Sequence, residues 1–260
     1  MSYFAVPKLS RRVLKVWLRN RDVFMKTYKV NFLPPFLEPL LYLFALGFGL
    51  GRYIDVIEGI SYAKFIAPAL ISISIMNSAF FECTFGSYVR MYYQKTFDAI
   101  IATPLSIEEV ITGELLWGAT RSLIYATIML PVIAAFGLID LPLSLLIIPF
   151  SFIAGFLFAT IGMCFTAITS NINSLNYPTY LFITPMFLFS GTFFPLALLP
   201  KPIQYFALAT LPLTHLVMIT RALTLANLSG VLLLSLAWIV LVSLILFVLA
   251  VNLMKRRLIV

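Results

Sequence analysis

Six stretches of this 260-residue chain are apolar over nearly the length that a helix needs to cross a lipid bilayer. The apolar runs are continuous and do not alternate with polar residues, so they predict spanning helices and not the strands of a barrel. Composition agrees, because 62% of the residues are hydrophobic and only 11% are charged. The sequence therefore predicts an all-α polytopic membrane protein with a single transmembrane domain over residues 1–260.

The expected spans cover residues 30–51, 65–85, 110–138, 143–169, 177–194 and 231–254. Pro34, Pro35 and Pro39 lie near the start of the first, and they should bend or loosen that end of the helix. Cys83 and Cys164 both fall inside predicted spans, so we interpret them as small buried side chains and not as a disulfide.

The distribution of basic residues predicts the orientation. With both termini in the cytoplasm, the cytoplasmic side holds the eight Lys and Arg before residue 30, Arg90, Lys95 and the run Lys255–Arg257. The external side then holds only Arg52, Lys64, Lys201 and Arg221. Because Lys and Arg concentrate in cytoplasmic loops, this orientation is strongly favoured over its mirror image.

Two stretches outside the spans have amphipathic patterns. Residues 4–29 place apolar and basic side chains on opposite helical faces, which predicts a helix lying in the headgroup layer. It is either a simple anchor or also one wall of a groove. Residues 86–109 carry a helical stripe that includes Tyr93 and Phe97, then Pro104 and a capping box from Ser106 to Glu109. This second stretch is either a docking element or an ordinary interfacial connector.

A broken apolar segment precedes the last span. The run ending at Ser190-Gly191 breaks at Pro195, and a second, shorter apolar run follows Pro200 and Pro202. We expect residues 195–225 to form an external re-entrant helical hairpin, which enters the membrane and returns without crossing. His215 then either supports the turn of this hairpin or contacts a substrate, and the first alternative is favoured.

Four ionisable residues fall within or near the predicted hydrocarbon region: Glu38, Glu82, Glu114 and Arg121. Each would cost roughly 2.5–3.5 kcal/mol at a helix centre, so each needs a partner, a cavity or a place near the interface. Glu114 and Arg121 lie two turns apart on one helical face, too far apart for a simple pair, so we expect them to serve neighbouring helices or a cavity. The three glutamates have an alternative, which is solvation at the membrane ends.

Several kinds of chemistry have no support in the sequence. His215 is the one histidine, so neither a two-histidine metal site nor a histidine relay is expected. No phosphate-binding Gly-x-x-x-x-Gly-Lys-Ser/Thr loop occurs, and we expect neither an enzyme nor a bound cofactor. The net charge of +8 is explained by cytoplasmic membrane ends, and no nucleic-acid partner is expected.

The motifs together resemble those of ABC-2-type transporter permeases. The resemblance rests on Leu-Phe-Ser-Gly-x-Phe-Phe-Pro at 188–195, the Leu-Pro pair at 199–200, and Pro-Leu-Thr-His at 212–215 followed by Arg221. It extends to Glu-Pro-Leu at 38–40, Ala-Phe-Phe-Glu at 79–82, Gln-Lys-Thr-Phe-Asp-Ala-Ile at 94–100 and Gly-Glu-Leu-Leu-Trp at 113–117. Within these permeases the chain is most similar to the lipo-oligosaccharide, or nodulation-factor, exporter branch.

The resemblance implies a partnership in a bacterial-type cytoplasmic membrane. Two permease chains would pair and bind two copies of a cytoplasmic ATP-binding subunit, which would hold ATP and Mg²⁺. The stretch 86–109 would be the coupling helix, with Arg90, Tyr93, Lys95, Phe97 and Asp98 as coupling residues. Gly191, Pro195, Pro212, His215 and Arg221 would belong to the re-entrant segment at the exit.

The resemblance also implies a path for the substrate between two permeases, lined by the first and fifth spans. The candidate stacking side chains for sugar rings or acyl chains are Tyr28, Phe32, Phe36, Tyr42, Tyr177, Tyr180 and Phe187. Aromatic residues in a membrane protein also serve as lipid contacts, which is the alternative for this set. The cargo remains open among lipo-oligosaccharide, polysaccharide, glycolipid and hydrophobic drug, and a scaffold or sensor subunit is the second class of function.

Overall fold

Four long helices form the body of the protein in a computed structural model, which describes residues 6–32, 34–54, 56–226 and 230–259. The side chains of residues 29–32, 34–36, 38 and 231 lie outside the description. Each of the four is long and apolar enough to cross a membrane. The first covers Tyr62–Tyr93 and consists of α3 (Tyr62–Phe81) and two π-helical turns, η3 (Glu82–Gly86) and η4 (Val89–Tyr93). The second is α5 (Ile107–Ala135), and the third covers Leu143–Ile168 with η5 (Leu143–Leu146) and α6 (Ile147–Ile168). The fourth is α11 (Val231–Leu258).

The predicted first and fifth spans are helical but broken. The first comprises α2 (Pro34–Tyr42), η1 (Leu43–Gly49) and η2 (Leu50–Arg52), and the fifth comprises α7 (Asn176–Pro178), η7 (Thr179–Ile183) and α8 (Thr184–Phe189). The all-helical class is confirmed, whereas the described residues contain four spanning helices of full length, or five if one bent pair is counted.

That bent pair lies in the proline-rich segment. After η8 (Leu196–Leu198), α9 (Lys201–Thr210) and α10 (Pro212–Thr224) meet at an angle of 91°. Pro212 is the first residue of α10, a position where its missing N–H costs no helical hydrogen bond. The chain therefore turns sharply at a helix-breaking proline of this segment.

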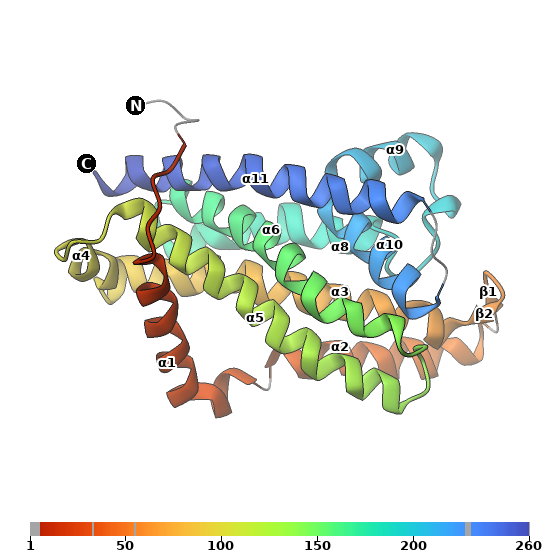
Figure 1. The fold of residues 1–260 in the computed structure, drawn as a ribbon. Coiled ribbons are helices and arrows are strands. Elements are labelled where there is room, and N and C mark those ends of the chain that lie inside the picture. Colours follow the sequence, from red (N-terminus) through yellow and green to blue (C-terminus); the bar gives the residue numbers. More distant parts are fainter. Residues whose placement is uncertain (1–5, 33, 55, 227–229, 260) are drawn as a thin grey trace.

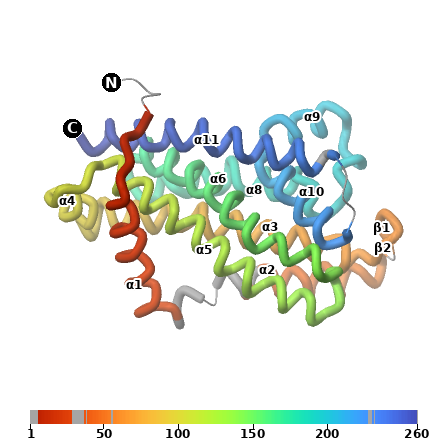
Figure 2. Tube along the Cα trace, in the orientation of Figure 1, coloured from red at the N-terminus to blue at the C-terminus, as the bar shows by residue number. Residues whose placement is uncertain are grey.

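Shorter elements lie at the two ends of the bundle. They are α1 (Val13–Phe32), α4 (Thr96–Ile101), η6 (Ile172–Leu175) and the two-stranded antiparallel hairpin of β1 (Val56–Ile57) and β2 (Ile60–Ser61). The start of α1, helix α4 and the end of α11 gather at one end, and the hairpin and α9 lie at the other (Figure 1). Helix α1 crosses the long helices steeply, as the tube in Figure 2 makes plain.

Small residues bring the long helices together. A Cβ added to Gly155 of α6 would lie 2.5 Å from Ser122 of α5, and one added to Gly162 would lie 2.8 Å from the carbonyl oxygen of Phe80 in α3. Close backbone approach through glycine is the common way to pack helices in a membrane, where lipid supplies no hydrophobic force between them. Helix α3 is largely buried, while α11 keeps most of its apolar surface outward.

The helix that begins at Tyr62 continues to Tyr93, well beyond the predicted end of the second span at residue 85. Glu82, Ser87 and Arg90 make this part of the sequence polar, yet all three side chains are buried or nearly so. Hydropathy alone therefore places the end of the helix too early.

Candidate functional site

Glu82 connects two arginines at the start of the π-helical extension of α3. Its Oε1 lies 2.8 Å from Nη1 of Arg90, and its Oε2 accepts a hydrogen bond from Nη1 of Arg121. The Arg121 guanidinium also donates to the hydroxyl of Tyr125 over 2.8 Å. The carboxylate is buried, so solvation is not how its charge is stabilised.

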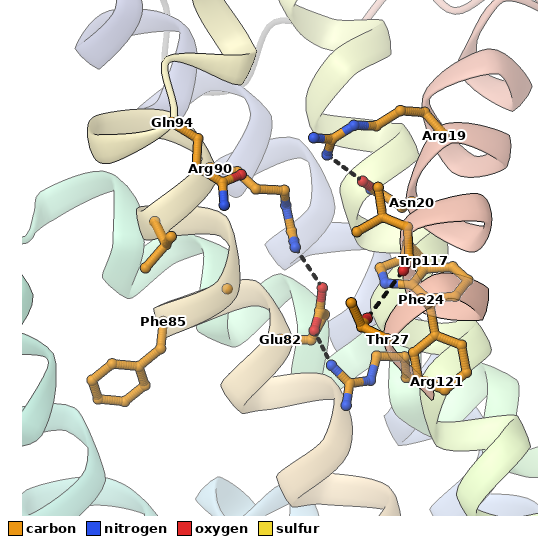
Figure 3. A pocket seen from close by; sticks show the side chains of 13 residues that line it. Arg19, Asn20, Phe24, Thr27, Glu82, Phe85, Arg90, Gln94, Trp117 and Arg121 are labelled. Atoms are coloured by element: carbon orange, nitrogen blue, oxygen red, sulfur yellow. Dashed lines mark hydrogen bonds and ion pairs between the residues drawn. The ribbon is translucent and has the colours of Figure 1, made fainter. Parts of the chain in front are cut away.

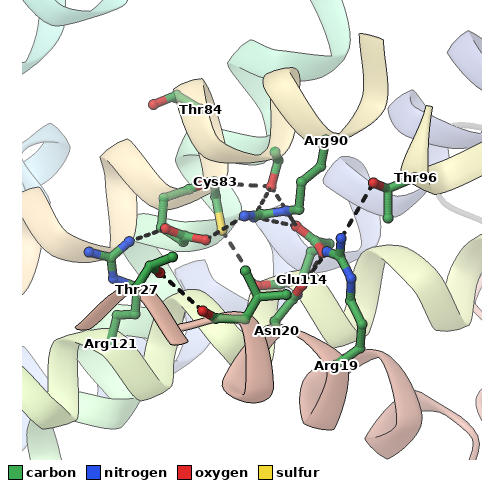
Figure 4. A network of polar contacts seen from close by, with 12 residues as sticks. Arg19, Asn20, Thr27, Cys83, Thr84, Arg90, Thr96, Glu114 and Arg121 are labelled. Atoms are coloured by element: carbon green, nitrogen blue, oxygen red, sulfur yellow. Dashed lines mark hydrogen bonds and ion pairs between the residues drawn. The ribbon is translucent and has the colours of Figure 1, made fainter. Parts of the chain in front are cut away.

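Glu114 is also fully buried and has three neighbours. Its Oε2 accepts from Nη2 and Nε of Arg90, at 2.6 and 2.8 Å, and from the hydroxyl of Ser87 at 2.9 Å. The side-chain amide of Asn20, from α1, donates to its Oε1 over 2.7 Å. Figure 3 shows Glu82 between Arg90 and Arg121, and Figure 4 shows Arg90 beside Glu114.

Glu114 and Arg121 each contact a neighbouring helix, which is one of the two arrangements expected from their spacing. Both lie on α5, but each pairs with a residue of the α3 helix and its extension: Glu114 with Arg90, and Arg121 with Glu82. Two carboxylates and two guanidinium groups balance each other, which a low-dielectric interior requires. The side chain of Glu38 lies outside the described residues.

Helix α1 closes over this network. Val16 packs against Gly113, where an added Cβ would lie 2.6 Å from the valine Cβ. The indole of Trp17 donates to the Thr120 hydroxyl over 2.8 Å, and the rings of Phe24 and Trp117 lie 5.5 Å apart. Helix α1 is therefore more than a surface anchor, because it packs on α5.

A cavity of about 340 Å³ lies between α1, the α3 extension and α5, and Figure 3 shows its lining. Each of the three segments contributes both polar and apolar side chains to it. The lining residues are Arg19, Asn20, Val23, Phe24, Thr27, Glu82, Phe85, Gly86, Val89, Arg90, Gln94, Trp117 and Arg121. Burial lowers the pKa of the Arg19 guanidinium, and the Glu114 carboxylate opposes this shift.

The predicted coupling residues divide into three groups. Tyr93, Lys95 and Asp98 are exposed, and Lys95 ends the preceding helix in a left-handed conformation (φ 52°). Phe97 is fully buried in the core, and Arg90 is held by its two carboxylates. Only the first group is available to a partner.

The capping box at the start of α5 is confirmed, and it ties several segments together. The Ser106 N–H donates to Glu109 over 2.8 Å, while the Glu109 N–H donates to the Ser106 hydroxyl. Glu109 also accepts from Ser10, and Lys255 at the end of α11 lies 2.5 Å from Glu108.

The candidate path residues are only partly brought together. Tyr42 and Phe187 lie 5.7 Å apart, and Phe193 contacts both rings. Tyr177 and Tyr180 are 67% and 68% exposed on the broken fifth segment, and Tyr28 lies apart on α1. The side chains of Phe32 and Phe36 are outside the described residues.

Two of the predicted residues of the proline-rich segment, Gly191 and Arg221, are joined by a hydrogen bond. Gly191 has a positive φ of 73°, and its carbonyl accepts from Arg221 over 2.9 Å. The Arg221 guanidinium lies 3.9 Å from the centre of the Phe65 ring. Pro195 precedes η8, directly after the Gly191 turn.

The His215 side chain contacts residues of α9 and α11. Its Nε2 lies 2.8 Å from the carbonyl oxygen of Leu208, its Nδ1 lies 3.2 Å from the Ser235 hydroxyl, and its ring stacks on Trp238 at 4.3 Å. These contacts favour the structural interpretation of this residue. Among the described residues, no three His, Cys, Asp or Glu side chains gather as metal ligands, and Cys83 and Cys164 are both free.

Four further residues belong to this site and were not predicted from the sequence: Arg19, Asn20, Ser87 and Trp117. Asn20 is a polar residue on the otherwise apolar face of an amphipathic helix, a signal that a search for interruptions of that face would find. Ser87 and Trp117 carry no comparable signal, since either residue type is common at helix ends and in cores.

In a comparison with known families, the ABC-2 type transporter profile matches residues 11–225, a range that includes most of the helical bundle and the proline-rich segment. This chain belongs to the ABC-2 type transporter family.

Its relatives extend over most of its length. The chain is 33% identical to Nodulation protein J of Sinorhizobium fredii (strain NBRC 101917 / NGR234) over 245 residues, which cover 94% of this chain and 93% of that protein. It is 35% identical to Nodulation protein J of Rhizobium leguminosarum bv. viciae over 208 residues, 80% of each. Over 198 residues it is 24% identical to the inner membrane transport permease YadH of Escherichia coli (strain K12), covering 71% of this chain and 72% of that one. No solved structure matches the chain.

Proposed function

We propose that this chain is the membrane-spanning permease subunit of an ATP-driven exporter. Its cargo would be a lipid-linked or amphipathic glycan, such as a lipo-oligosaccharide, polysaccharide or glycolipid, moved out of the cytoplasm or inner leaflet. One observation carries this proposal: the similarity to Nodulation protein J relatives runs through nearly the whole of both chains. The branch named from the sequence motifs is the lipo-oligosaccharide exporter branch.

The proposed arrangement in the bacterial inner membrane has six crossings, with the broken segments 30–51 and 177–194 as the first and fifth. Both termini would be cytoplasmic and α9–α10 would be re-entrant on the external side. The basic residues at the start of α1 and the end of α11 lie at the same end of the bundle as α4, which supports this orientation. The 91° bend between α9 and α10 supports re-entry.

Helix α4 would dock on a cytoplasmic ATP-binding subunit, which would hold ATP and Mg²⁺. Lys95 and Asp98 are 66% and 60% exposed beside the exposed Tyr93, so a charged and aromatic surface projects from that end. Burial of Phe97 supports α4 as a rigid element, because its ring fastens the helix to the core.

Two copies of this chain, with two ATP-binding subunits, would enclose the path of the substrate. Exposed apolar side chains on the broken first and fifth segments support pairing along that face, and they include Leu41, Phe44, Tyr177, Tyr180 and Leu181. The contact of Tyr42 with Phe187 joins these two segments within one chain.

Two other functions compete with this proposal. A hydrophobic drug could be the cargo of the same machinery, or the chain could be a scaffold or sensor subunit whose ATPase drives another event. Reconstitution of the permease with its ATP-binding subunit in inside-out vesicles separates the three.

We expect ATP-dependent movement of a fluorescent lipo-oligosaccharide into the lumen, and none with an ATP-binding subunit that cannot hydrolyse ATP. Movement of a fluorescent hydrophobic drug in place of the glycan would support the drug exporter. ATP hydrolysis by an assembled complex that moves neither compound would support the scaffold or sensor.

A further inference from the structure

The cavity under α1 has the size and lining of a small-molecule site. Its volume of about 340 Å³ falls in the range of ligand pockets, which are mostly apolar with a few polar groups that converge. Here the guanidinium groups of Arg19, Arg90 and Arg121 line the cavity from three helical segments, together with the rings of Phe24 and Trp117. Such a lining fits an amphipathic ligand with an anionic group.

The charges around the cavity do not cancel. Glu82 and Glu114 together pair with Arg90 and Arg121, which leaves Arg19 as the third guanidinium. Among the described residues no carboxylate oxygen lies within ion-pair distance of Arg19, and Glu114 acts on it only from farther away. Its hydrogen bonds go to neutral oxygens, 2.9 Å to Asn20 and 3.5 Å to Thr96. Among the described side chains, the site therefore carries one positive charge in excess.

A second observation points to a missing acceptor. The Nε of Arg121 is buried and has no hydrogen-bond partner within the part of the chain that the structure describes. Buried N–H groups nearly always have an acceptor, and this one belongs to a side chain that lines the cavity. An oxygen-rich anion in the cavity would satisfy it.

The position of the cavity beneath an amphipathic helix indicates that the ligand is a lipid. Helix α1 is amphipathic, with a basic side that suits the headgroup layer, and the cavity lies directly beneath it. A phosphodiester carries one negative charge, which equals the excess, and offers several oxygens to guanidinium donors. An acyl chain could leave along Phe85 and Val89.

We propose that this cavity binds the phosphodiester headgroup of one anionic membrane phospholipid, held by Arg19 and Arg121 between α1 and the α3 extension. The bound lipid neutralises the excess charge and fastens α1 to the bundle. The proposal does not depend on what the exporter carries.

The test measures lipid retained by the purified full-length chain during delipidation, by native mass spectrometry, and thermal stability after lipid is added back. We expect the chain to retain about one phosphatidylglycerol and to be stabilised by phosphatidylglycerol vesicles more than by phosphatidylcholine vesicles. Arg19→Gln should weaken phosphatidylglycerol binding about tenfold, a change of about 1.4 kcal/mol. Arg21→Gln is the matched control, because Arg21 lies two residues away on α1, is exposed and pairs with Asp22.

A second variant tests the cavity without changing charge. Val23 lines the cavity and is 47% exposed, so Val23→Trp should occupy the space, displace the lipid and leave the protein folded. Equal retention by Arg19→Gln and Arg21→Gln, or equal retention of the two phospholipids, would overturn the proposal. Stabilisation by inorganic phosphate equal to that by phosphatidylglycerol would assign the site to a free anion. Recovery of a phosphate-bearing glycolipid in place of phospholipid would assign it to the cargo, and either result would overturn the membrane-lipid assignment.

Discussion

At the scale of single residues, the stability of the fold depends on buried charges that are paired with charges of opposite sign. Glu82 forms ion pairs with both Arg90 and Arg121, and its removal would leave Arg121 without a carboxylate partner among the described residues. Breaking a buried pair costs more than forming it contributes, because an uncompensated charge stays behind in a low-dielectric place.

Glu82→Gln should therefore lower the free energy of unfolding by about 3 kcal/mol. Thermal unfolding of the purified protein in detergent, followed by tryptophan fluorescence, measures the loss. Asp98→Asn is the control, since the Lys95–Asp98 pair is exposed and spans 3.9 Å, and it should change stability by no more than about 0.5 kcal/mol. Equal losses in the two variants would refute a structural role for the network.

Arg221 has a comparable role in the proline-rich segment. Its guanidinium donates to the carbonyls of Gly191 and Phe65 and lies over the Phe65 ring. A lysine ammonium cannot reproduce this planar arrangement.

Arg221→Lys should increase amide hydrogen exchange in residues 188–196 by roughly tenfold, the effect of one lost charged hydrogen bond. Lys201→Arg, on the exposed start of α9, should leave exchange in that segment unchanged. Unaltered exchange in Arg221→Lys would mean that Pro195 and Gly191 shape the turn without the arginine.

At the scale of elements, helix packing depends on glycines that admit another backbone. Gly155 allows α6 to approach Ser122 of α5, and Gly113 allows α1 to approach the same helix through Val16. These contacts connect the two halves of the sequence and hold the N-terminal helix over the charged network.

Gly155→Ala should force α5 and α6 apart and cost about 1–3 kcal/mol, as overpacking does. Reduced thermal stability in detergent is the readout. At Gly49 an added Cβ would meet its nearest neighbour at an ordinary 3.6 Å, so Gly49→Ala should leave stability nearly unchanged. If both variants unfold at the same temperature, the close approach of α5 and α6 does not limit stability.

Sequence and structure agree best where a signal is local. The capping box at Ser106, the helix start at Pro212 and the amphipathic α1 all follow from residues close together in the chain. The end of the α3 helix was predicted less well, because its polar residues Ser87 and Arg90 are buried by contacts with Glu114, which lies far away in the sequence. The same reason explains Phe97, whose burial depends on packing and not on its neighbours.

At the scale of the whole molecule, the two ends of the bundle have different surfaces. One end presents α4 with Lys95 and Asp98, and the other presents α9 and the β1–β2 hairpin. The proposed exporter would need its docking surface for a cytoplasmic subunit at one end only.

Asp98→Lys should abolish or strongly weaken co-purification with the proposed ATP-binding subunit while membrane insertion continues, because it reverses the charge of an exposed residue on the proposed docking surface. Glu58→Lys makes the same reversal on an exposed residue at the opposite end and should retain the subunit. Retention by both variants would identify α4 as a connector.

The exposed face with Tyr177 and Tyr180 belongs to the proposed path. Replacing both by Ala should lower ATP-dependent glycan transport several-fold without loss of the ATP-binding subunit, since a packed aromatic ring contributes on the order of 1 kcal/mol. Tyr205→Ala is the control, because Tyr205 is 69% exposed but lies on α9. Unchanged transport in the double variant would remove these tyrosines from the path.

The sequence by itself determined the class of this protein. Long apolar runs, basic residues near the ends of the chain and prolines between residues 195 and 212 are local quantities, and the motifs near Gly191 and His215 identified the family that the comparison confirmed. Only the tertiary structure decided how Glu82, Arg90, Glu114 and Arg121 pair, and that α1 covers them to form a cavity. Those contacts join residues from separate helices, and the partner of a buried charge is set by how the helices pack and not by its spacing along the chain.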